Sequence, residues 1–169
     1  MRKTYVVAAL ALAAAVAAAC SSTTGPADAG PTTYTIAGGC TNLPVTLSGA
    51  SVTLSGICDL GPQLGDFVLD AGLGISLGAC GDAGVTITAD WTQGSSVLYS
   101  TFTGNADVPC SAGNSGTIPI DGTFTFAGGT GPYSDATGSA ALDGGVAFGT
   151  SPTVPIGPVD FSLTGSLTY

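Results

Sequence analysis

The chain has 169 residues and a formal net charge of −9, with 11 acidic residues, two basic residues and no histidine. The basic residues are Arg2 and Lys3 and all of the acidic ones are aspartates, so every charged side chain after residue 3 is negative. Nucleic-acid binding, which needs Lys and Arg to neutralise phosphates, is excluded for that part of the chain. Catalytic triads that use an imidazole, and zinc sites built on His ligands, are excluded as well.

The first 19 residues have the composition of an export signal. Arg2 and Lys3 precede an apolar run, rich in Ala and Val, over residues 5–19. At about 1.5 Å per residue this run is too short to span a hydrocarbon core of roughly 30 Å. We therefore predict a signal peptide over residues 1–19 and not a transmembrane helix.

The end of this signal resembles the lipobox of bacterial lipoproteins. Small residues, Val16-Ala-Ala-Ala19, stand directly before Cys20, and a Ser-, Thr-, Gly- and Pro-rich stretch follows. The resemblance implies that Cys20 is acylated and becomes the mature N-terminus, anchored to a membrane. Ser21, and not Asp, follows the Cys, which is similar to lipoproteins sent to the outer membrane, facing either the periplasm or the cell surface. Ala17 stands where Leu is usual, and the alternative is ordinary cleavage after Ala19, which releases a soluble protein.

Residues 20–32 are predicted to form a flexible tether, because they show no apolar periodicity. The remaining four cysteines form an even set with wide spacings, which indicates two disulfides in an oxidising compartment. Three connectivities are open, and we favour the sequential one, in which each bridge contributes about 3 kcal/mol. It joins Cys40 to Cys58 and Cys80 to Cys110.

Residues 33–169 are predicted to form one all-β domain, an antiparallel barrel or sandwich of roughly 8–10 strands. Apolar and polar residues alternate in several runs, as in Val85, Ile87 and Ala89 or in Phe124 and Phe126. Gly- and Asp-containing segments between such runs are expected to be turns. They are Asp70-Ala-Gly72, Gly81-Asp-Ala-Gly84, Asp121-Gly122, Gly128-Gly129 and Asp143-Gly-Gly145.

The segment from Gly122 to Gly145 resembles the hairpin, with a GGTG loop, of allene oxide cyclase-like and dirigent-like β-barrels and of related secreted bacterial β domains. The matching loop residues are Gly128, Gly129, Gly131 and Tyr133. The resemblance implies either a loop that lines a ligand site or a structural corner that closes a barrel, and we favour the corner. Pro132 replaces the usual Arg, so no active site is carried over to this chain.

The aspartates also suggest a calcium site, since Ca²⁺ prefers oxygen ligands and would relieve the negative charge. Candidate ligands are Asp66, Asp70 and Asp82, although no regular calcium-binding spacing is present. We favour the alternative that these aspartates occupy turns. A glycosidase-type carboxylate pair is disfavoured, and Trp91 is expected to be a core residue.

Two functions follow from these observations. The leading one is a lipid-anchored envelope protein with a structural or interaction domain that is not an enzyme, has no catalytic residues and no required cofactor, and contacts a protein partner. The alternative is a small barrel that binds an apolar small molecule in its interior.

Overall fold

The computed structural model describes residues 30–48, 51–74, 81–109, 116–149 and 155–169. These residues form nine β-strands and one short 3₁₀ helix. The strands are β1 (Thr33–Leu43), β2 (Val45–Ser48), β3 (Ser51–Asp59), β4 (Asp66–Gly74), β5 (Gly81–Gln93), β6 (Ser96–Val108), β7 (Gly116–Gly129), β8 (Thr137–Phe148) and β9 (Pro155–Thr168), and the helix is η1 (Gly131–Tyr133).

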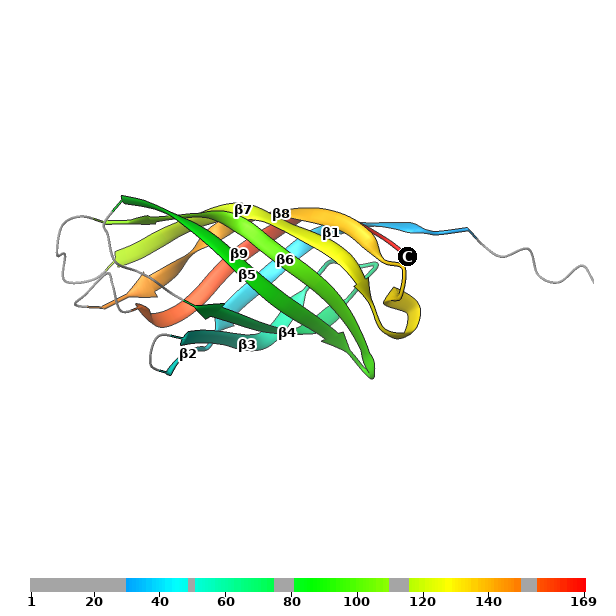
Figure 1. The fold of residues 1–169 in the computed structure, drawn as a ribbon, viewed down its shortest axis with the longest axis horizontal. Coiled ribbons are helices and arrows are strands. Elements are labelled where there is room, and N and C mark those ends of the chain that lie inside the picture. The colour runs from blue at the N-terminus through cyan, green and yellow to red at the C-terminus, as the bar shows by residue number, and fades with distance from the viewer. Residues whose placement is uncertain (1–29, 49–50, 75–80, 110–115, 150–154) are drawn as a thin grey trace, which may run out of the picture. The chain divides into compact units, whose positions relative to one another are not determined.

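The strands form a closed antiparallel barrel, which decides between the two predicted architectures in favour of a barrel (Figure 1). From β3 to β9 each strand pairs with its neighbour in sequence, and β9 pairs with β1. The pairing of β1 with β3 then closes a ring of eight strands. The remaining strand, β2, lies outside this ring; it follows β1 after Pro44 and pairs with another part of β3. Local hairpin connections between long alternating strands favour this up-and-down topology.

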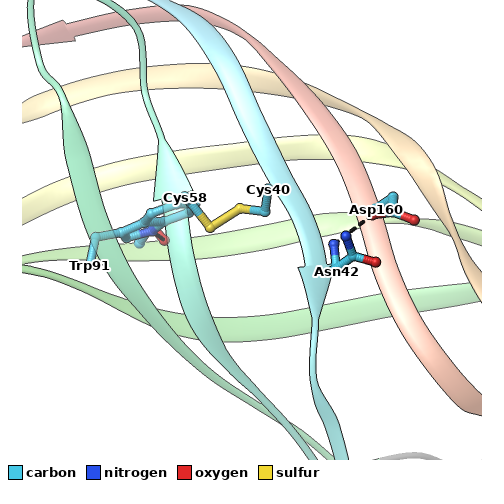
Figure 2. The surroundings of a disulfide bond; sticks show 6 residues. Cys40, Asn42, Cys58, Trp91 and Asp160 are labelled. Atoms are coloured by element: carbon cyan, nitrogen blue, oxygen red, sulfur yellow. Dashed lines mark hydrogen bonds between the residues drawn. A yellow bond between two sulfur atoms is a disulfide. The ribbon is translucent and has the colours of Figure 1, made fainter.

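The contact that closes the barrel is short and is crossed by a disulfide. Strand β1 pairs with β3 at only two positions, where Gly39 lies opposite Asp59 and Cys40 opposite Cys58. Cys40 and Cys58 are bonded to each other, with their Cα atoms 4.3 Å apart and both side chains buried (Figure 2). This bridge is one of the two that the sequence predicts. Cys80 and Cys110, like Cys20, lie outside the described residues, so their predicted pairing and acylation stay predictions.

Apolar side chains mostly point inward and polar ones outward along the long strands, as the period-two pattern predicts. Trp91 is fully buried, as expected, and its indole nitrogen donates a hydrogen bond of 2.8 Å to the Ser100 hydroxyl. Phe124 and Phe126 pack edge-on against the Trp91 ring. No buried side-chain nitrogen or oxygen in the described part of the chain lacks a hydrogen-bond partner. The core is therefore an aromatic-rich interior whose polar atoms are all paired.

Most of the predicted turns are wrong, because their glycines and aspartates lie inside strands. The segments 70–72, 121–122 and 143–145 lie inside β4, β7 and β8, the segment 81–84 begins β5, and Gly128-Gly129 ends β7. Several of these glycines lie where another strand passes too close for a side chain. A Cβ atom at Gly144 would overlap the Asp160 carbonyl oxygen of β9. Close backbone approach, and not a reversal of the chain, accounts for such a glycine.

Candidate functional site

The predicted GGTG loop closes one end of the barrel. We call this the capped end; it comprises the turns 60–65, 94–95 and 130–136 with the start of β1 and the end of β9. Gly128 and Gly131 have φ angles of +74° and +61°, which are easily reached only by glycine. The Gly128 amide donates to the Ala136 carbonyl at 2.7 Å and fixes the loop. The structure thus places the four predicted loop residues together at a tightly bonded corner.

The side chain of Tyr133 packs into the core at the capped end. Its ring is 2% exposed and packs against Phe67 and Tyr169, with ring centroids 5.8 and 4.8 Å away. Its hydroxyl donates a hydrogen bond of 2.7 Å to the side-chain oxygen of Gln93, and burial raises the pKa of Tyr133. Because its ring and hydroxyl are both occupied within the fold, the geometry matches the structural-corner interpretation of this loop.

Tyr169 gives the capped end a pH dependence. Burial, followed by the neighbouring phenol groups of Tyr133 and Tyr34, raises the pKa of Tyr169 from 10.0 to about 12. A phenol that ionises less readily in the folded protein stabilises it below pH 10, and this contribution is lost as the pH rises toward 12. We expect the thermal midpoint of Tyr169→Phe to fall less than that of the wild type over this range. If the thermal midpoints of the two proteins fell equally between pH 10 and 12, the assignment to Tyr169 would be contradicted. Tyr99→Phe is the control, because Tyr99 is exposed on β6.

A small cavity lies in the barrel interior. Its volume is about 40 Å³ and its lining is apolar, with Leu54, Ile87, Phe102, Ile120 and Val159 among the lining residues. Dedicated small-molecule sites are usually several hundred Å³ in volume. The residues of the GGTG loop do not contribute to this cavity. The interior around this cavity is therefore mostly filled, and the void is large enough for water but has no polar group to hold it.

The three candidate calcium ligands lie in strands and point outward, which corrects the prediction that they occupy turns. Asp66, Asp70 and Asp82 are exposed, and each lies directly opposite another aspartate on the neighbouring strand. The described part of the chain contains no group of three or more His, Cys, Asp or Glu side chains arranged to hold a metal ion. Asp66 and Asp70, on the same strand, lie beside different partners and do not share a site.

Direct aspartate pairs are a general feature of this barrel. Like charges at facing positions of adjacent strands are destabilising, yet eight of the ten aspartates in the described part form such pairs. The pairs are Asp59 with Asp66, Asp70 with Asp90, Asp82 with Asp107, and Asp121 with Asp143. Because the chain has no basic side chain after residue 3, no lysine or arginine of the barrel balances them.

One of these pairs, Asp59 with Asp66, and Asp143 of another line a surface groove of about 700 Å³ over the closing contact of the barrel. Gly39 lies in the middle of one row of facing residues, next to Ser162 of β9 on one side and Asp59 of β3 on the other. Asp66 continues the row beyond Asp59, and Asp143 continues it beyond Ser162. Gly39 lines the groove without a side chain, and a Cβ atom there would overlap the Phe161 carbonyl oxygen of β9. Asp160 and the exposed side chain of Ile57 also line the groove. We call these six residues, Gly39, Ile57, Asp59, Asp66, Asp143 and Asp160, the acidic groove.

Hydrogen bonds hold two of the groove carboxylates in place. Asp160 accepts a hydrogen bond of 2.6 Å from the backbone amide of Asn42 (Figure 2), and Asp59 accepts one of 2.7 Å from the amide of Gly61. Asn42 has a φ angle of +54° and lies where the pairing of β1 with β9 shifts register, between Cys40 and Leu43. The irregularity that follows the disulfide thus orients Asp160 at one side of the groove.

The facing aspartates predict that a single charge reversal stabilises the fold. Asp66→Lys replaces a repulsive contact with Asp59 by an attractive one, and we expect the free energy of unfolding to rise by about 1 kcal/mol at low salt. Asp135→Lys makes the same change of net charge in an exposed turn outside the strand pairs. Urea denaturation of both variants at low and high salt measures the difference, which salt should reduce. If both variants raised the free energy of unfolding equally, the gain would come from the change in net charge alone.

Sequence reasoning missed the acidic groove. Its residues come from five strands and are brought together by the register, which residue spacing does not reveal. The one local signal is that Asp59 and Asp66 flank the turn 60–65 symmetrically. No helix in the described residues is long and apolar enough to cross a membrane. Comparison of the chain with protein-family models, with curated proteins and with solved structures finds no match.

Proposed function

We propose that this protein is a lipid-anchored cell-envelope protein whose barrel is an interaction domain and not an enzyme. The observation that carries the proposal is the outer surface of the barrel, where exposed hydroxyl-bearing and acidic side chains alternate with the buried core. After residue 3 the chain has no His, Lys or Arg. The common nucleophilic and acid–base sites that use these residues therefore cannot form in that part of the chain. The interior is largely filled, so contacts with other molecules fall to the outside.

The charge of this surface selects the chemistry of the partner. A one-signed surface attracts oppositely charged molecules and repels those of like charge. At the acidic groove four carboxylates surround an open strip over Gly39, with the exposed side chain of Ile57 beside them. This arrangement suits a cationic segment of a partner protein that also carries an apolar residue. The lipid on Cys20 would keep the domain at the membrane surface, where such a partner would be met.

The groove is tested with two matched variants. The first carries Asn in place of Asp59, Asp66, Asp143 and Asp160, and the second carries Asn in place of Asp70, Asp90, Asp82 and Asp107. Both lose four charges, and both remove facing aspartates, but only the first changes the acidic groove. The probe is a basic peptide of alternating Lys and Leu, with binding measured by calorimetry. We expect the first variant to lose about tenfold or more in affinity and the second to lose much less. Equal losses would mean that net charge alone attracts the peptide.

The anchor is tested separately in a host that processes lipoproteins. The full chain should be found in the membrane fraction, with acyl chains detected by mass spectrometry on a mature N-terminal Cys20. No processed, acylated form of the Cys20→Ala variant should be found in that fraction. A wild-type protein that is cleaved after Ala19 and recovered without acyl chains would overturn the anchor but leave the interaction domain unaffected.

The second candidate function is binding of an apolar small molecule inside the barrel, and the cavity lined by Leu54, Ile87 and Phe102 favours it. The volume of about 40 Å³ ranks it second, because a larger ligand would have to displace core side chains. Native mass spectrometry with dodecanoate tests it. A one-to-one complex with the folded protein would promote this function, and no complex would leave the interaction domain as the better account.

A further inference from the structure

Three tyrosines that are far apart in sequence meet at the capped end of the barrel. Tyr34 lies near the start of β1, Tyr133 lies in η1, and Tyr169 follows β9. The backbone of Tyr169 exchanges two hydrogen bonds with Thr32, of 2.9 and 3.1 Å, and this continues the β1–β9 ladder by one pair. The ladder therefore holds Tyr34 and Tyr169 beside each other on the inner face of two adjacent strands.

The rings of Tyr34 and Tyr169 are stacked. Their centroids lie 4.8 Å apart and their planes are inclined by only 20°. Both side chains are half-buried, so each remains in contact with solvent. Tyr133 meets the Tyr169 ring at the same centroid distance but nearly edge-on, at 76°, and is buried. Of the three, Tyr34 and Tyr169 therefore have both the face-to-face arrangement and the access.

We propose that Tyr34 and Tyr169 are a site of oxidative cross-linking, where a one-electron oxidant such as a peroxidase supplied with hydrogen peroxide joins the two rings as dityrosine. Each phenol gives up one electron and its hydroxyl proton and becomes a phenoxyl radical. A carbon–carbon bond forms between the two ring positions next to the hydroxyls. The hydrogens displaced there move to the oxygens and restore the phenols. The protein loses two hydrogens in total, and one peroxide molecule is reduced to two waters.

The cross-link would join β1 and β9, the first and last strands of the barrel in sequence, by a covalent bond. Tyr34 lies just after the predicted tether, and Tyr169 directly follows β9, the last strand in sequence, which pairs with β1. A covalent bond between them closes almost the whole domain into one loop, and cross-links that close long loops restrict the unfolded chain the most. For an exported protein exposed to oxidants this bond would prevent β1 and β9 from separating where the tether joins the domain.

The test oxidises the purified full chain, with its disulfides intact, by illuminated tris(bipyridine)ruthenium and persulfate. We expect a monomer that lacks two hydrogens and shows dityrosine fluorescence, in a yield that does not depend on protein concentration. Since the chain has no basic residue after Lys3, an Asp-specific protease replaces trypsin for mapping. After reduction, the peptide 28–58 should be joined to the peptide that begins at Asp160. The thermal midpoint should rise by about 5–15 °C.

Two variants that keep the ring test the assignment. Tyr34→Phe and Tyr169→Phe should each abolish the monomeric product, and because only a hydroxyl is removed the fold can be checked by circular dichroism. Tyr99→Phe is the matched control, since Tyr99 is exposed on β6, away from the cluster, and can couple only between molecules. A monomeric product that maps to Tyr133, or one that persists in Tyr34→Phe, would overturn the proposal. So would a product that consists only of dimers and is lost in Tyr99→Phe.

Discussion

Replacing both Cys40 and Cys58 by alanine is expected to lower the free energy of unfolding by about 3–5 kcal/mol. The bridge closes a loop with a sequence separation of 18 residues, for which the loss of chain entropy in the unfolded state corresponds to about 3 kcal/mol. Loss of two buried sulfur atoms leaves a small cavity, which adds to the cost. Urea denaturation followed by circular dichroism measures the change.

The position of the bridge makes the effect more than a loss of stability. On one side β1 is held to β9 by a ladder of nine residue pairs, but on the other only two pairs join it to β3. Without the disulfide we expect these two pairs to separate first, so that the barrel opens along this line while the remaining ladders persist. Opening exposes apolar core, which a naphthalene sulfonate dye would report below the unfolding transition. A loss below about 1 kcal/mol without dye binding would show that the ladders of β1 with β9 and of β2 with β3 suffice to close the barrel.

The direction of each side chain was predictable because it depends only on alternation within one strand. Val85, Ile87 and Ala89 share one face and Thr86 and Thr88 the other, whatever strand lies alongside. The same local pattern occurs in barrels and sandwiches, however, so it left the choice between them open. That choice depends on whether β1, at one end of the strand order, reaches β3 near the other end, and the two pairs between them are set by the register of all the other strands.

The acidic groove shows the same limit at the level of function. Asp59 and Asp143 belong to strands that are distant in sequence, and they flank one groove because Gly39 and Ser162 lie between them in the pairing. Residue types alone placed Asp143 in a turn and indicated no role for Asp59. Propensity favours Asp in turns, but nine aspartates of the described part occupy exposed strand positions against that preference. Exceptions to local preference are expected at functional or strained sites, which is one reason why we propose a cationic partner for the acidic groove.

Gly104→Ala is expected to lower the free energy of unfolding by about 3 kcal/mol or more, which is large for one methyl group. Gly104 lies opposite Gly122 in the pairing of β6 with β7. A Cβ atom at position 104 would overlap the Asp121 carbonyl oxygen and lie 2.6 Å from Cζ of Phe102, whose ring is 1% exposed. The backbone oxygen is fixed by the pairing of β6 with β7 and cannot move away, and the Phe102 ring can shift only within the small cavity that it lines.

Gly84→Ala provides a matched control on the adjacent strand. Gly84 lies opposite Asn105, next to the pair formed by Val85 and Gly104, and a Cβ atom there would meet nothing within 4 Å. We expect its effect to be within about 0.5 kcal/mol of zero or slightly stabilising, because alanine restricts the unfolded chain more than glycine. Equal effects of the two substitutions would mean that the barrel relaxes around residue 104.

A second substitution separates the two contacts at Gly104. Phe102→Leu shortens the side chain that a methyl group at position 104 would strike but leaves the Asp121 carbonyl in place. In a double-mutant cycle, Gly104→Ala should therefore cost less in the Phe102→Leu background than in the wild type, with a coupling of about 1 kcal/mol. The part of the cost that remains is the contact with the backbone of β7, which only glycine avoids. Gly122, which the sequence alone marks as part of a turn, is thus one of two glycines that let adjacent strands approach closely around a phenylalanine ring.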